Sequence, residues 1–222
     1  MAGKNASPLA QDDSASPAAA QNKTPSASSL TRTVALVGLM GAGKSVIGRR
    51  LASALKARFR DADDEIERAA GMKIPEIFES FGEPYFREGE RRVIARLLSD
   101  PPHVLATGGG AYMDAETRAH MHENAVTVWL KADLDTLTKR CEKRNSRPLL
   151  KKGSVRETLG RLIQERYPVY GDADVTVESR DEPHAEIVQR VVEALRAQGV
   201  LVASEDPSGN AADPAKPGGP EA

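Results

Sequence analysis

The sequence predicts a three-layer α/β/α fold, in which a five-stranded parallel sheet carries helices on both faces. Two observations lead to this expectation. Four short apolar runs, and a short segment led by Phe59, alternate with longer segments whose apolar residues recur at helical spacing. The first run, residues 34–37, leads straight into a glycine-rich turn and a helical pattern, which is how a parallel strand–helix–strand unit begins.

Each element follows from a local pattern. Strands are expected at residues 34–37, 59–61, 104–106, 126–130 and 175–177. Helices are expected from Ser45 onward, around 65–70, 74–81 and 87–98, at 134–144, at about 155–166, and after Pro183. Pro101 and Pro102 end the helix at 87–98, because proline cannot continue a helix.

The two ends of the chain differ in composition from its middle. Residues 1–31 are rich in Ala, Ser, Pro, Gln and Asn, and the last twenty are rich in Pro, Gly, Ala and acids. Such segments bury too little apolar surface to offset the entropy of ordering them. We therefore expect disordered tails at 1–31 and 201–222 around a single domain at 32–200.

Bulk properties exclude several classes of protein. The formal net charge of −1 offers no general attraction to nucleic acid. Cys141 is the only cysteine, which excludes an intramolecular disulfide and fits a reducing compartment. No apolar stretch is long enough to span a bilayer, and the N-terminus lacks a signal-peptide core. The expectation is a cytoplasmic protein with no membrane or nucleic-acid partner.

Residues 38–45 fit the phosphate-binding pattern G-x-x-x-x-G-K-[ST]. Its glycines let backbone N–H groups point at a phosphate, and the following helix adds its dipole. Lys44 can reach the outer phosphates, and the Ser45 hydroxyl can hold Mg²⁺. The pattern predicts a nucleotide site but does not identify the phosphate acceptor.

Asp61 and Asp63 form a second constellation. In an extended segment, residues two apart share a face, so both carboxylates can point into one site. Ligands of open α/β sheets bind beyond the carboxyl ends of the strands, which places this pair beside the phosphate loop. One acid could help hold Mg²⁺ and the other could orient an attacking hydroxyl. A solvated acidic turn is the alternative, because three more acids follow within four residues.

Three further features can be interpreted either as parts of a functional site or as ordinary turns and surface charges. Residues 108–110 are all glycine and admit a closely approaching ligand, or form a flexible turn. Arg147 lies in a basic stretch that could bring it onto a γ-phosphate, or could be a solvated positive face. Arg87 and Arg166 lie outside that stretch and leave two separate positive positions, although each could be a surface charge.

Together these motifs resemble those of shikimate kinases. The order is Gly-x-Met-Gly-Ala-Gly-Lys-Ser, Asp-x-Asp, Phe-Arg-x-x-Glu, Gly-Gly-Gly, Arg-Pro-Leu-Leu and Arg-x-Pro-x-Tyr. The resemblance covers residues 32–198 and implies a P-loop kinase fold with a mobile lid at about 145–158. It implies ATP-dependent phosphorylation of the 3-hydroxyl of shikimate, with Mg²⁺ as cofactor, by a monomer.

The resemblance also assigns roles to individual residues. For the nucleotide it implies Gly41, Ala42, Gly43, Lys44, Ser45, Val46, Arg140 over the adenine and Arg147 on the lid, with a looser match to an adenine-binding loop at 179–183. For the metal it implies Ser45 and Asp61. For shikimate it implies Asp63 as acceptor of the hydroxyl proton, Arg87 and Arg166 on the carboxylate, Glu90 orienting Arg87, Gly109 and Gly110 against the substrate, and Phe78 and Phe86 around the ring.

Three alternatives stay open at this point. A gluconate-type or nucleoside-type kinase would keep the phosphate loop without needing Asp63, Arg87 and Arg166 together. A nucleotide-gated switch is weakened because the chain has no Asn-Lys-x-Asp motif and Asp133 does not follow a clean apolar run. A binding module without turnover would not need the carboxylate of Asp63.

Overall fold

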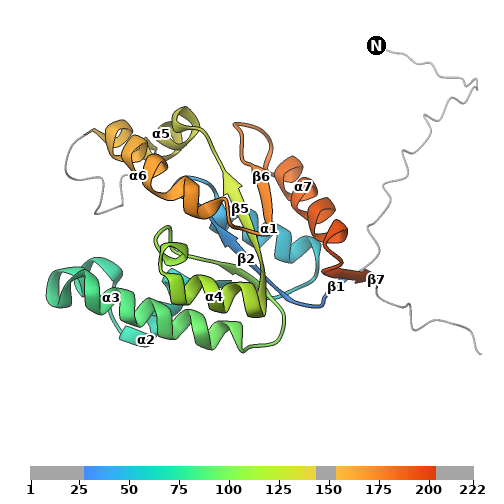
Figure 1. The fold of residues 1–222 in the computed structure, drawn as a ribbon, viewed down its shortest axis with the longest axis horizontal. Coiled ribbons are helices and arrows are strands. Elements are labelled where there is room, and N and C mark those ends of the chain that lie inside the picture. The colour runs from blue at the N-terminus through green and yellow to red at the C-terminus, as the bar shows by residue number, and fades with distance from the viewer. Residues whose placement is uncertain (1–27, 144–153, 204–222) are drawn as a thin grey trace, which may run out of the picture.

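The computed structural model describes residues 28–143 and 154–203 (Figure 1). Five parallel strands form the central sheet in the order β3-β4-β2-β5-β6. Their bounds are β2 Thr33–Val37, β3 Phe59–Asp61, β4 Val104–Ala106, β5 Ala125–Lys131 and β6 Val175–Glu178. This confirms the expected five-stranded parallel sheet.

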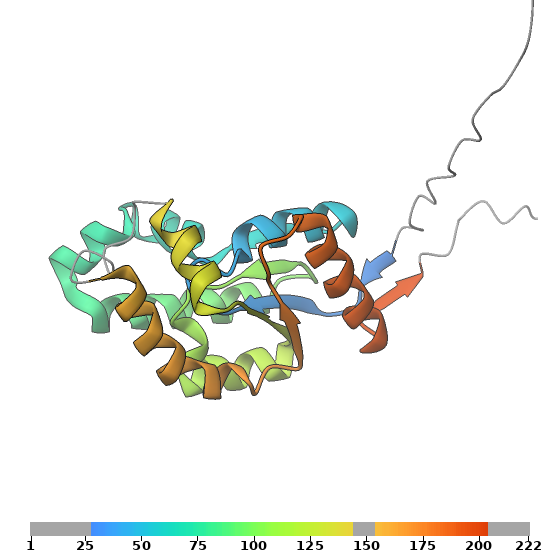
Figure 2. The ribbon, with the colours of Figure 1, turned by 90° about the horizontal axis from the view of Figure 1, so that it is seen from above.

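Helices cover both faces of the sheet and complete the three layers. Their bounds are α1 Lys44–Ala54, α2 Ala62–Ala70, α3 Ile74–Leu98, α4 Ala115–Asn124, α5 Leu134–Glu142, α6 Val155–Tyr170 and α7 His184–Ala197. Figure 2 shows α1 and α4 on opposite faces. Helix α1 packs on β4 and α7, whereas α4 packs on β5 and α3.

The inner strands are buried along their length, which is why they read as continuous apolar runs. Every residue of β2 is buried, as are the first six of β5. Strand β6, at the edge of the sheet, alternates buried and exposed residues instead. Burial of the sheet on both sides therefore accounts for the sequence pattern that predicted it.

Helix α3 joins two helices that were predicted separately. Gly82 interrupts it with φ 78° and ψ 175°, and Pro84 follows two residues later. The interruption separates the segment around Phe78 from the segment that carries Arg87 and Glu90. Helix α6 also runs further than predicted, to Tyr170, with Pro168 inside its last turn.

Helix α4 and the 3₁₀ turn η1 (Ala111–Met113) were not predicted. The α4 sequence has no apolar stripe, and only Thr117 and Met121 of its residues are buried. Its start is set by Asp114, whose carboxylate accepts a hydrogen bond from the Thr117 N–H at 2.9 Å. Capping and packing on α3 form this helix without a hydrophobic pattern.

The prediction of disordered tails is wrong for the residues next to the domain. Strand β1 (Ser28–Leu30) pairs antiparallel with β7 (Leu201–Ala203), and the Thr31 N–H bonds to the Val200 carbonyl at 3.0 Å. Six residues assigned to disordered tails thus form strands, because backbone pairing does not need the long apolar run that the prediction looked for. Apart from Thr31, the rest of both predicted tails lies outside the described residues.

The predicted lid is described only at its end. Residues 144–153 lie outside the described part, and Arg147 is among them. Residues 155–158 are not part of a loop, because they form the first turn of α6. Within residues 28–143 and 154–203, no helix has the length and apolar character needed to cross a bilayer.

A buried carboxylate fastens α2, and with it Asp63, to its surroundings. Glu65 accepts hydrogen bonds from Arg60 of β3 at 3.0 Å, from Arg96 of α3 at 3.0 Å, and from Arg68. Burial alone would raise the pKa of Glu65, but the hydrogen bonds from Arg96 and Arg68 outweigh it and hold the pKa below its usual value. The charge of Glu65 therefore links three elements at the edge of the site.

Two helical glycines give a matched test of the packing of α1 on the sheet. A Cβ on Gly48 of α1 would lie 2.6 Å from the Phe59 ring and 3.1 Å from Leu36, whereas a Cβ on Gly89 of α3 would meet nothing within 4 Å. We expect Gly48→Ala to lower the free energy of unfolding by about 1–3 kcal/mol. Gly89→Ala should raise it by about 0.5–1 kcal/mol. Urea denaturation measures both; equal stabilisation by the two changes would contradict close packing at Gly48.

Candidate active site

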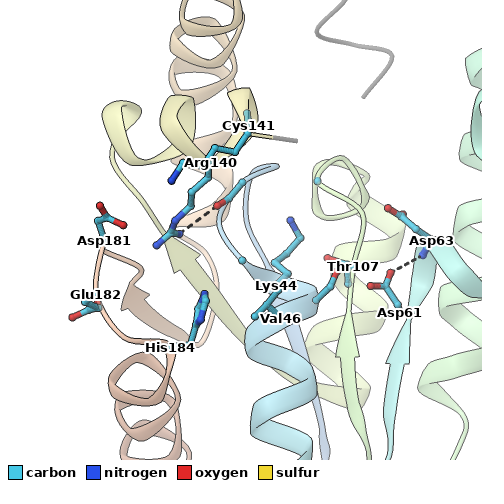
Figure 3. A pocket seen from close by; sticks show the side chains of 15 residues that line it. Lys44, Val46, Asp61, Asp63, Thr107, Arg140, Cys141, Asp181, Glu182 and His184 are labelled. Atoms are coloured by element: carbon cyan, nitrogen blue, oxygen red, sulfur yellow. Dashed lines mark hydrogen bonds between the residues drawn. The ribbon is translucent and has the colours of Figure 1, made fainter. Parts of the chain in front are cut away.

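A cavity of about 290 Å³ lies at the carboxyl ends of β2, β3 and β4 (Figure 3). Predicted site residues that line it are Gly41, Gly43, Lys44, Ser45, Val46, Asp61, Asp63, Gly109 and Arg140. Asp181, Glu182 and His184 line the end of the cavity away from Asp63. The acids of β3 and α2 and the turn before α7 are thus on opposite sides of the phosphate-loop pattern.

The phosphate-loop pattern connects the end of β2 to the start of α1. Gly41 and Gly43 have φ of 83° and 98°, a conformation that favours glycine, and Gly43 caps α1. The loop therefore brings the amino end of α1, with its outward N–H groups and dipole, to the cavity. This is an anion-binding geometry, and Lys44 and Ser45 are the first residues of that helix.

Lys44 is held along this loop. Its Nζ donates hydrogen bonds to the carbonyl oxygens of Gly38 at 2.7 Å and Leu39 at 3.0 Å. The side chain is buried yet lines the cavity. A buried ammonium group at the amino end of a helix provides a concentrated positive charge for phosphate oxygens.

Arg140 ties the loop to the turn before α7. Its Nη1 donates to the Ser179 hydroxyl at 2.9 Å and to the Gly41 carbonyl at 3.3 Å. The buried Ser179 hydroxyl in turn donates to the Ala42 carbonyl at 2.9 Å. Residues from α5, the loop and the 179–183 turn therefore form one hydrogen-bonded wall. Asp181 on this wall has a lowered pKa because Lys139 donates a hydrogen bond to it.

Asp61 and Asp63 both face the cavity, but the reasoning that paired them is wrong. Asp61 ends β3 and caps α2, accepting the Asp63 N–H at 3.2 Å, so Asp63 is helical and does not share an extended face with Asp61. The capping preference of aspartate ends the strand one residue earlier than the alternation requires. The pair nevertheless meets in one cavity, because the helix begins at the sheet edge.

The side-chain oxygen atoms of Ser45 and Asp61 suit magnesium. Among the described residues, no group of three or more His, Cys, Asp or Glu side chains could form a metal cage. Ser45 and Asp61 line the same cavity and offer hard oxygen ligands. Mg²⁺ commonly binds through one or two such ligands together with phosphate oxygens and water.

The three glycines admit close side chains. A Cβ on Gly108 would lie 2.6 Å from Glu90 Oε1 and 3.1 Å from Asp63 Oδ1, and a Cβ on Gly110 would lie 2.7 Å from the Arg87 guanidinium. Any larger residue at either position would displace a charged group of the site. The turn therefore acts as a surface on which charged side chains rest.

Two guanidinium groups meet this turn. Arg166, from α6, donates through Nη1 to the Gly109 carbonyl at 2.6 Å. Arg87, from α3, lies against Gly110 and donates to Glu90 Oε2 at 2.6 Å and to Glu83 Oε1 at 3.0 Å. With 30% of its side chain exposed, Arg87 is not a plain surface charge. Phe86 lies 5.1 Å from its guanidinium and packs on Phe78.

Glu90, the carboxylate that holds Arg87, is buried, and its burial opposes its negative charge. Only 3% of its side chain is exposed, and among the described residues Oε1 has no hydrogen-bond partner. Burial raises the pKa of Glu90, and its interaction with Arg87 opposes that rise without cancelling it. The nearby Asp63 adds to the rise. Glu90 thus holds Arg87 at a cost in desolvation.

Some predicted site residues do not line the cavity. Arg87, Glu90, Gly110 and Arg166 do not line the 290 Å³ cavity; they lie around the glycine turn at its Asp63 end. Ala42 is buried within the loop, and Arg147 is outside the described residues. Sequence reasoning did not assign Thr107, Cys141, Lys143 or His184 to the site, although all four line the cavity. Thr107 follows β4 directly, and that position at a strand end was the available signal.

A family model described as shikimate kinase matches residues 40–196, more than half of the chain. This chain belongs to the shikimate kinase family. The resemblance carried by the motif order is therefore confirmed. The matched range includes almost the whole phosphate loop, the acid pair, both arginines of the glycine turn, and the turn before α7.

Several shikimate kinases are similar to this chain over most of their own length. One from Bradyrhizobium diazoefficiens is 58% identical over 166 residues, which are 75% of this chain and 80% of that protein. One from Caulobacter vibrioides is 56% identical over 165 residues, 74% of this chain and 82% of that protein. A solved structure, shikimate kinase from Acinetobacter baumannii in complex with shikimate, has a TM-score of 0.73 and 36% identity, covering 75% of this chain and 94% of that one.

The burial of Glu90 predicts a pH dependence of stability. Because its pKa is raised above the usual 4.5, the folded state holds the proton to higher pH than the unfolded state does. The free energy of unfolding of the protein, compared with that of Glu90→Gln, should therefore fall as pH rises above about 4.5. Urea denaturation of both proteins from pH 4 to 8 measures this difference. A difference that grows in favour of Glu90 with rising pH would show that Arg87 outweighs desolvation.

Proposed function

We propose that this protein transfers the γ-phosphoryl group of ATP to the 3-hydroxyl of shikimate, giving shikimate 3-phosphate and ADP in the pathway to aromatic amino acids. Membership of the shikimate kinase family supports the reaction. The relative solved with shikimate supports the acceptor. The residue roles below belong to this proposal.

The pair of guanidinium groups on the glycine turn is the observation that carries the choice of acceptor. Arg166 bonds to Gly109, and Arg87 rests against the next residue, Gly110. Two guanidinium groups converging on adjacent residues suit a small carboxylate, because each presents a planar fork of N–H donors. Phe78 and Phe86 beside them offer an apolar wall for a carbon ring.

The phosphate loop supplies the donor end of the proposed site. Backbone N–H groups of Gly41 to Val46, with Lys44, would hold the β- and γ-phosphates. Arg140 and the 179–183 turn would border the adenine, and Arg147 would reach the transferring phosphate. Ser45 and Asp61 would hold Mg²⁺, Asp61 through water, and the ion would neutralise charge on the phosphate oxygens.

Asp63 is the proposed acceptor of the hydroxyl proton. It lines the same cavity as Lys44 and lies next to Gly108, which Glu90, the partner of Arg87, also approaches. A hydroxyl held there would lie between the phosphate loop and the two guanidinium groups at the glycine turn. The remaining catalysis is positioning and charge neutralisation, with no covalent intermediate.

The proposal includes a monomer working in the cytoplasm. Every group assigned to the site comes from one chain, so no second copy is needed to complete it. The lone cysteine, Cys141, is buried and fits a reducing compartment.

A coupled assay of ADP release tests the reaction itself. With ATP, Mg²⁺ and shikimate we expect turnover that EDTA abolishes and added Mg²⁺ restores. Gluconate in place of shikimate should give no turnover. Turnover with gluconate and none with shikimate would remove the acceptor assignment and leave only the kinase class.

The proton acceptor is tested by Asp63→Asn, with Asp64→Asn as the matched control. Asp64 is the next residue, is exposed, and does not line the cavity. We expect Asp63→Asn to lower kcat by about 10²- to 10⁴-fold, the usual contribution of a general base. The KM for ATP should change little, because the phosphate loop is untouched. Unchanged turnover, or an equal loss in Asp64→Asn, would reject Asp63 as the base.

A further inference from the structure

The buried hydroxyl of Tyr170 lies against the glycine turn. Tyr170 ends α6, is fully buried, and donates a hydrogen bond from its hydroxyl to the Gly109 carbonyl oxygen. The Arg166 Nη1 donates to the same oxygen at 2.6 Å. One carbonyl oxygen has two lone pairs, so these two donors use its full capacity.

Gly109 is constrained from its other side by the phosphate loop. A Cβ placed on it would lie 3.5 Å from the Met40 nitrogen and 3.6 Å from the Gly38 carbonyl, and 3.7 Å from Arg166. The peptide is thus packed between the loop and the end of α6. The direction of its carbonyl decides where a guanidinium bonded to it can lie.

We propose that Tyr170 is a positioning residue of the acceptor site, whose hydroxyl holds the Gly109 carbonyl so that Arg166 is aimed at the carboxylate of shikimate. This inference rests on the proposed function. A guanidinium has five N–H donors, and the bond to Gly109 uses one of them. The others stay available for a carboxylate only while that bond sets the plane of the group.

The ring of Tyr170 has a separate, structural role. It packs among Trp129, Tyr112 and Tyr167, with centroid distances of 5.9 to 6.3 Å. Phenylalanine would keep these contacts, because it differs from tyrosine only by the hydroxyl. The substitution Tyr170→Phe therefore removes the hydroxyl's interactions with Gly109 and Arg166 and leaves the packing.

The hydroxyl stays a donor across the physiological range. Burial raises the pKa of Tyr170, with Arg166 opposing the rise, so the phenol remains protonated. Arg166 also interacts directly with the Tyr170 hydroxyl, so the phenol can donate to Gly109 and face the Arg166 guanidinium at the same time. The pair of donors on Gly109 is therefore stable to pH.

Tyr167 provides a matched control on the same helix. Its ring packs edge-on against Trp129 at 4.9 Å, and its hydroxyl donates to the Ala132 carbonyl at the end of β5, away from the glycine turn. Burial raises its pKa to about 12, so it too remains a donor. Tyr167→Phe removes a comparable hydrogen bond without touching Gly109.

The experiment compares the intact protein with Tyr170→Phe and Tyr167→Phe. For Tyr170→Phe we expect the KM and calorimetric Kd for shikimate to rise about three- to tenfold, the effect of one lost hydrogen bond. Its kcat and its KM for ATP should stay within twofold. Tyr167→Phe should leave all four constants within twofold, and melting temperatures identify any general loss of structure. Equal effects of the two changes would overturn the inference.

A second comparison tests whether Tyr170 acts through Arg166. Arg166→Lys should itself weaken shikimate binding, and adding Tyr170→Phe should change the Kd by less than twofold more, because the group it positions is gone. Additive effects of the two substitutions would overturn the inference. Absence of shikimate turnover by the intact protein would overturn the proposed function, and the substrate named here with it.

Discussion

The position of β2 in the middle of a parallel sheet is the constraint on which the rest of this structure depends. Its neighbours β4 and β5 run the same way, and β3 lies beyond β4. The carboxyl ends of three strands therefore meet along one edge, where the chain turns into the phosphate loop, α2 and the glycine turn. The proposed donor, metal and acceptor groups are adjacent because the strand order makes them so, although some of them are more than a hundred residues apart in the chain.

At that edge, charged side chains contact backbone more than one another. Arg140 bonds to loop carbonyls, Lys44 to two more, and Arg166 to the glycine turn. Backbone at the end of a sheet is a rigid support. Cations bonded to it are already ordered, so they lose less conformational entropy when a ligand binds. Arg87 is the exception, because it is held by the carboxylates of Glu90 and Glu83. That arrangement costs desolvation at Glu90 and leaves this cation partly neutralised before any anion arrives.

The sequence predicted those features whose local pattern and tertiary setting agree. The inner strands β2 and β5 read as apolar runs because both faces of the sheet are covered there, and the phosphate loop is contiguous in sequence. Helix α4 escaped prediction because a cap at Asp114 and packing on α3 replace the missing apolar stripe. The conformation at Asp63 was wrong because capping by Asp61 overrode strand alternation. The contact of Tyr170 with Gly109 joins residues 61 apart, and no local pattern encodes such a pairing.

The pairing of β1 with β7 determines where the folded protein can be attached to a surface, a dye or a second protein. Leu30 leads through two residues into the amino end of β2, whereas the cavity opens at the carboxyl end of that strand. In Figure 1 the two short strands lie side by side at the edge of the molecule away from α3. A surface, a dye or a second protein joined at either end of the folded part would therefore be tethered at one shared point, behind the sheet, and would leave the mouth of the cavity facing outward.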